Sequence, residues 1–199
     1  MAIRVKTVWF KNAGGRSAAE VSTVLASTVW RLADNAVAGL SKADCDILTP
    51  ERGMRIVGEV AAFLLHMADR MLHGRVPEPE RARLVQGAGE RLAEIVRDNI
   101  RTMAPDDDFD HKANFIDFLN RRFADYATFE CPPEKPSFTL LRYLGLAVRE
   151  LMLESDQPWV ADQIMEIEAP EALGTLKKTV DGLLAPAQPA PRRGAMAGE

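Results

Sequence analysis

Four ionisable side chains share one face of a predicted helix that covers residues 50–73. Helical geometry of ~100° per residue places Glu59, His66, Arg70 and His73 within roughly 60° of one another. Two of the three histidines of the chain are in this group. Such a face can form the polar wall of a cavity that binds a metal ion, an acid or a redox cofactor, and metal sites in helical bundles are built in this way.

Asp69 lies about 40° beyond this group and completes the candidate set. We refer to Glu59, His66, Asp69, Arg70 and His73 as the polar face. Two readings of the polar face are open. It forms a ligand, metal or cofactor site, or it is a solvated surface held by ordinary salt bridges. The helical rise separates His66 from His73 by about 10.5 Å, so the two rings do not converge on one ion.

Other patterns that support catalysis or metal binding are missing from the sequence. The Glu-x-x-His pairs of di-iron bundles do not occur. The acidic run 106–110 precedes a predicted helix, where carboxylates interact favourably with free amides. Cys45 lies between two aspartates that we expect to raise its pKa, and Cys131 fits no nucleophile pattern. We therefore predict no catalytic residue, no metal ligand set and no particular cofactor, and the pattern disfavours an enzyme while leaving catalysis open.

Composition limits the class of protein. The 199 residues carry a formal net charge of −4, with basic and acidic residues interspersed, which argues against a nucleic-acid partner. No apolar run approaches the ~18 residues of a membrane span, and the N-terminus lacks the pattern of a signal peptide. Two isolated cysteines indicate free thiols. These features predict a soluble, cytoplasmic protein with no membrane partner.

Apolar residues recur at helical spacing through almost the whole chain, and strong capping signals mark where helices begin. Ser17 and Glu20 form a capping box, and Thr49 precedes a proline at the first position of a helix. Gly39 is expected to end the first helix. Further helices are predicted over 79–103, 110–127, 138–153, 158–167 and 170–184.

The fold class predicted from this pattern is all-α, a six- to seven-helix bundle. A central antiparallel pair is expected from the helices over 50–73 and 79–103, since only a short turn separates them. Gly87 and Gly89 interrupt the second of these helices, which predicts that another helix approaches closely there.

The chain divides into three predicted parts. Residues 1–16 form an extended arm, because apolar and polar residues alternate between Ile3 and Phe10. Residues 17–184 form a single helical domain. Residues 185–199, rich in Pro, Ala, Gly and Arg, form a disordered tail.

Aromatic residues occur in the arm, at the edge of a helical stripe, or beside turns, which are positions typical of core margins and of subunit interfaces. The members of this set are Trp9, Phe10, Trp30, Phe129 and Trp159. The leading functional hypothesis is a non-enzymatic accessory or regulatory protein that acts through protein–protein interaction, as a homodimer. The alternative is a ligand-, metal- or cofactor-binding bundle that uses the polar face. Burial of that face distinguishes the two hypotheses, because a buried charge is costly unless it is paired.

Overall fold

The computed structural model describes residues 16–47, 49–132 and 135–185, and the regular structure of these residues is entirely helical. The predicted all-α class is therefore confirmed. Except for Arg16 and Ala185, the predicted arm and tail lie outside the described residues. The α-helices are α1 (Ala18–Lys42), α2 (Pro50–Leu72), α3 (Glu78–Met103), α4 (His111–Tyr126), α5 (Phe138–Arg149), α6 (Gln157–Gln163) and α7 (Ala169–Leu184).

The capping signals in the sequence coincide with the observed helix starts. Ser17 and Glu20 form the complete capping box at α1. The Thr49 side chain accepts a hydrogen bond from the third residue of α2 at 3.2 Å. The prediction that Gly39 ends the first helix was wrong, because α1 continues to Lys42. A glycine lowers helix propensity by only about 1 kcal/mol, which tertiary packing readily offsets.

The core is organised around α2, which packs against α1, α3, α4, α5 and α7. Its middle is continuously buried from Ile56 to Ala68, as expected of a helix with neighbours on several sides. A central pair formed by α2 and α3 is not confirmed, because α3 packs more extensively against α1 than against α2.

Close approach at Gly87, which the sequence predicts, is observed between α3 and α1. A Cβ added to Gly87 would lie 2.9 Å from the Ser22 hydroxyl oxygen. That hydroxyl donates a 3.0 Å hydrogen bond to the Leu84 carbonyl. The absence of a side chain at Gly87 thus lets the two helices come together. A Cβ added to Gly89 would make only ordinary van der Waals contacts, with side chains of α2 and α4, so no comparably close approach occurs there.

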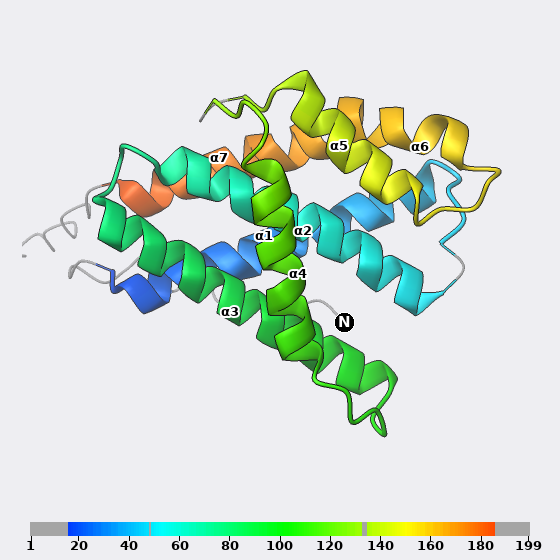
Figure 1. The fold of residues 1–199 in the computed structure, drawn as a ribbon, viewed down its shortest axis with the longest axis horizontal. Coiled ribbons are helices and arrows are strands. Elements are labelled where there is room, and N and C mark those ends of the chain that lie inside the picture. Colours follow the sequence, from blue (N-terminus) through cyan, green and yellow to red (C-terminus); the bar gives the residue numbers. More distant parts are fainter. Residues whose placement is uncertain (1–15, 48, 133–134, 186–199) are drawn as a thin grey trace, which may run out of the picture.

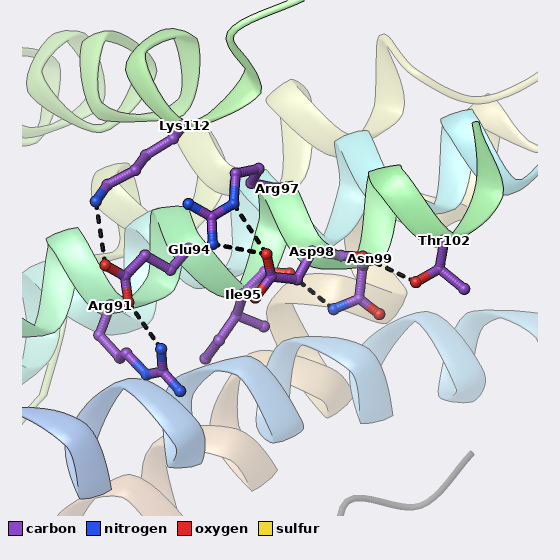
Figure 2. Close-up of polar contacts among 8 residues, drawn as sticks. All are labelled: Arg91, Glu94, Ile95, Arg97, Asp98, Asn99, Thr102 and Lys112. Atoms are coloured by element: carbon purple, nitrogen blue, oxygen red, sulfur yellow. Dashed lines mark hydrogen bonds and ion pairs between the residues drawn. The ribbon is translucent and has the colours of Figure 1, made fainter. Parts of the chain in front are cut away.

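Helix α4 lies across α2 and α3 (Figure 1). Near its start, Lys112 forms an ion pair with Glu94 of α3 at 3.1 Å, and Glu94 also accepts a bond from Arg91 (Figure 2). These two cations lower the pKa of the Glu94 carboxyl. Partly exposed pairs of this kind contribute little stability, so the position of α4 depends mainly on its buried contacts.

The last three helical segments form one continuous rod. The π-helical segment Ile164–Glu168 joins α6 directly to α7, so the two helices predicted over 158–167 and 170–184 are continuous. Within the described part of the chain, no helix combines the length and the apolar character needed to cross a membrane.

Candidate functional site

The polar face divides into a buried half and an accessible half. Glu59 and His66 are 5% and 6% exposed, respectively. Asp69 and Arg70 are half-buried, and His73 is exposed at the end of α2. The five residues therefore do not form one site, and only Glu59 and His66 meet the burial criterion of the ligand-binding hypothesis.

Glu59 is fully paired within the bundle. Both of its carboxylate oxygens accept hydrogen bonds from Arg122 of α4, at 2.7 and 2.5 Å. Arg122 also donates to the Tyr143 hydroxyl of α5 at 2.8 Å and to Asp125 at 3.2 Å. Tyr143 in turn donates to Asp125 at 2.6 Å. This cluster fixes α2, α4 and α5 relative to one another, since each charge has a partner of opposite sign.

Electrostatics within this cluster favour its present protonation state. Hydrogen bonding to Glu59 raises the pKa of Arg122 further above its usual high value. Burial, together with the hydrogen bond to Asp125, raises the pKa of Tyr143 to about 12. The guanidinium also lies over the Phe118 ring, 5.4 Å from its centroid. We interpret the cluster as structural, because its polar groups satisfy one another.

A pocket of about 330 Å³ opens next to this cluster. It lies between the C-terminal halves of α2 and α4 and the segment that follows α4. The residues that line it are His66, Asp69, Arg70, Phe123, Tyr126, Ala127, Phe129 and Cys131.

His66 lies in the wall of this pocket without a hydrogen-bond partner in the described structure. Both ring nitrogens are buried, and neither has a partner. Its neighbours are aromatic, with the Phe123 and Tyr126 ring centroids at 5.4 and 5.3 Å. Burial lowers the pKa of His66 to about 4. The imidazole is therefore neutral at pH 7 and offers one donor and one acceptor.

Tyr126 is the second unpartnered group of the pocket. The residue is fully buried, and its hydroxyl finds no hydrogen-bond partner among the described residues. Burial raises the pKa of the phenol well above 10, so the hydroxyl stays protonated. The ring is held by edge contacts with Phe63 and Tyr143. A buried polar group without a partner costs about 1–3 kcal/mol, so two such groups on residues that line one pocket need an explanation.

The rim of the pocket is charged. Arg70 donates from Nε to the Cys131 carbonyl at 3.2 Å, which holds the guanidinium beside the opening. The neighbouring carboxylate of Asp69 forms its ion pair with Arg81 of α3 instead. Burial raises the pKa of the Cys131 thiol, and its sulfur contacts Met67 at 3.4 Å. Cys131 is therefore a weak nucleophile at neutral pH.

The remaining candidate residues lie elsewhere. Trp30 is buried in the core and 9% exposed, and Trp159 is half-buried against the core. Trp9 and Phe10 lie outside the described residues. Across the described ranges, no group of three or more His, Cys, Asp or Glu side chains could hold a metal ion.

A larger hollow of about 590 Å³ lies between α1 and α7. Its buried acid, Glu168, comes from the π-helical segment and packs over Gly39, where a Cβ would overlap the carboxylate. Burial raises the pKa of Glu168, and Gln163 donates to it at 3.0 Å. Because this acid has a partner, the hollow gives weaker evidence for a ligand than the His66 pocket does.

Cys45 illustrates how burial modifies an expectation from the sequence. Its pKa is raised to about 11, in the predicted direction. The main cause is burial, followed by Asp156 and Glu168 from distant parts of the chain, rather than by the two aspartates beside it in sequence.

The partners that α4 and α5 bring to the polar face were not predicted from the sequence. Arg122, Tyr126 and Tyr143 were not among the predicted site residues. One signal was available, because the chain contains two tyrosines and both lie at this site. Tyrosine on the apolar stripe of a helix carries a hydroxyl that usually needs a partner when buried.

Comparisons with protein-family models, with curated proteins and with solved structures give no match in any of the three.

Proposed function

We propose that the chain is a small-molecule-binding helical protein, with its site in the pocket between α2 and α4. The observation that carries this proposal is the pair of buried, unpartnered polar side chains of His66 and Tyr126, two residues that line one pocket. A ligand that hydrogen-bonds to both would remove the penalty of leaving them unpaired.

The dimensions of the pocket suit this role. Its volume of about 330 Å³ lies at the lower end of the range of ~300–1,000 Å³ found for small-molecule sites. Its lining combines the aromatic rings of Phe123 and Phe129 with polar side chains of the kind that orient a ligand in such sites. We propose binding rather than catalysis, because the thiol in the pocket is held protonated and His66 is a weak base.

Native mass spectrometry of gently purified, untagged protein tests this proposal. We expect the wild type to retain a small molecule that His66→Ala and Tyr126→Phe lose. His73→Ala is the matched control, because His73 is exposed at the end of α2 and outside the pocket. Tyr126→Phe keeps the ring and guards against loss of binding through misfolding.

A second arm of the same test uses a fragment library and backbone amide NMR spectra. The proposal predicts that some fragments shift resonances of pocket residues in the wild type and not in Tyr126→Phe. Wild-type protein that has the bare chain mass and gives no pocket shifts with any fragment would overturn the proposal.

A second candidate function is the protein–protein interaction hypothesis, with a homodimer and a cytoplasmic location. Exposed aromatic side chains favour it: Phe138 and Phe109 are 67% and 57% exposed. Free thiols at Cys45 and Cys131 are consistent with a reducing compartment. Sedimentation of a chain that lacks residues 1–12 tests the dimer, and unchanged association of the truncated chain would refute a role for the arm.

A further inference from the structure

The chemistry of the same pocket indicates which class of ligand it takes, and this inference rests on the proposed function. Three side chains of the pocket wall are aromatic besides His66: Phe123, Tyr126 and Phe129. Aromatic side chains pack favourably against a flat ring through offset or edge contacts. The walls therefore favour a planar ring over a branched aliphatic chain.

The rim favours a negative charge. Among the residues that the structure describes, no carboxylate forms an ion pair with Arg70, because Asp69 pairs with Arg81. The bond from Nε to the Cys131 carbonyl engages only one edge of the guanidinium. A guanidinium binds a carboxylate through two parallel hydrogen bonds, which makes Arg70 suited to an acid.

The inner end of the pocket favours a neutral polar group. Tyr126 is fully buried and His66 nearly so, whereas Arg70 at the rim is half-buried. Their polar atoms are enclosed in this structure, so a ligand reaches them through a small shift of the side chains around the pocket. A hydroxyl on the ligand can both donate and accept, so it can then satisfy the phenol and one imidazole nitrogen together. The polar groups of the pocket are thus ordered by depth, from the charged side chains of Asp69 and Arg70 outside to neutral groups inside.

We propose that this pocket binds a small aromatic carboxylate that carries a hydroxyl group. Its carboxylate lies on Arg70, its ring lies against Phe123 and Phe129, and its hydroxyl meets His66 and Tyr126. Binding involves no covalent step.

Calorimetric titration of the full chain near pH 7 tests this assignment with three probes. They are 4-hydroxybenzoate, its neutral amide 4-hydroxybenzamide, and the non-aromatic acid 4-hydroxycyclohexanecarboxylate. We expect 4-hydroxybenzoate to bind at least about tenfold more tightly than either of the others, since each lacks one recognised feature. This comparison uses only wild-type protein.

Two variants assign the charge recognition to a residue. Arg70→Gln is expected to weaken binding of 4-hydroxybenzoate at least about tenfold and to leave binding of the amide unchanged. Arg75→Gln is the matched control, because Arg75 pairs with Asp181 outside the pocket. The Arg75→Gln variant should bind all three probes as the wild type does.

The outcomes separate this inference from the proposed function. Equal affinity for the acid and the amide, or equal loss of both in Arg70→Gln, overturns the carboxylate assignment while a ligand site remains. If none of the three probes binds, the assignment is overturned as well. The proposed function fails only if, in addition, neither a retained molecule nor any fragment is found at the pocket.

Discussion

The two tyrosines of the site make a matched pair for measuring the cost of an unpartnered hydroxyl. Tyr126→Phe removes one oxygen from a fully buried ring whose hydroxyl has no partner. The desolvation penalty of such a group is about 1–3 kcal/mol. We therefore expect the ligand-free protein to gain about 1–2 kcal/mol in the free energy of unfolding. At ~2–4 °C per kcal/mol for a chain of this length, Tm should rise by several degrees.

Tyr143→Phe should have the opposite effect. Its hydroxyl donates to Asp125 at 2.6 Å and accepts from Arg122 at 2.8 Å, so its loss breaks two bonds to charged groups. We expect a loss of about 1–3 kcal/mol. Urea denaturation of the wild type and both variants, without ligand, measures the difference. Destabilisation of Tyr126→Phe as large as that of Tyr143→Phe would show that the Tyr126 hydroxyl has a partner, and would refute the reasoning.

Three further predictions concern stability. Gly145→Ala should destabilise the protein by about 1–3 kcal/mol in urea denaturation, because the new Cβ would lie 3.1 Å from the Ala161 carbonyl oxygen. Gly174→Ala is the control: there is open space around this position, so the substitution should stabilise the protein by up to about 1 kcal/mol. Glu59→Gln should cost about 2–3 kcal/mol in the same assay, since it removes the buried carboxylate from Arg122 and leaves only the more exposed Asp125 as its ionic partner. A cost below that of an exposed ion pair would contradict this. Between pH 6.5 and 4 the imidazole of His66 takes up a proton in the unfolded chain, whereas in the folded chain, where its pKa is lowered to about 4, it stays neutral. The wild type should therefore lose up to about 3 kcal/mol relative to His66→Phe as the pH falls, and parallel pH–stability curves would refute this.

The helices were predictable because their signals are local. Capping at Ser17 and Thr49 depends on side chains within three residues of the helix start. The close approach at Gly87 is also indicated locally, since a glycine inside a helix lowers the stability of that helix and packing must offset this loss. The end of α1 was not predictable in this way, because tertiary contacts extend the helix past Gly39.

The candidate site was predictable only in part, because the residues that were not predicted come from other helices. The periodicity of α2 places Glu59 and His66 on one face. The periodicity does not indicate which helix covers that face. Arg122 and Tyr126 meet it because α4 crosses α2, and the crossing is set by packing between distant segments. The pairing of Glu59, and the lack of a partner for His66, are therefore properties of the assembled bundle.

The most direct test of a ligand site at His66 and Tyr126 is a crystal structure of untagged protein purified from its natural host, at a resolution that distinguishes a small molecule from water. We predict density for a small molecule between α2 and α4, with polar atoms about 3 Å from the His66 imidazole and from the Tyr126 hydroxyl. A closed pocket, in which both groups hydrogen-bond to other parts of the chain, would contradict the proposal. A pocket that contains only isolated water molecules would contradict it as well.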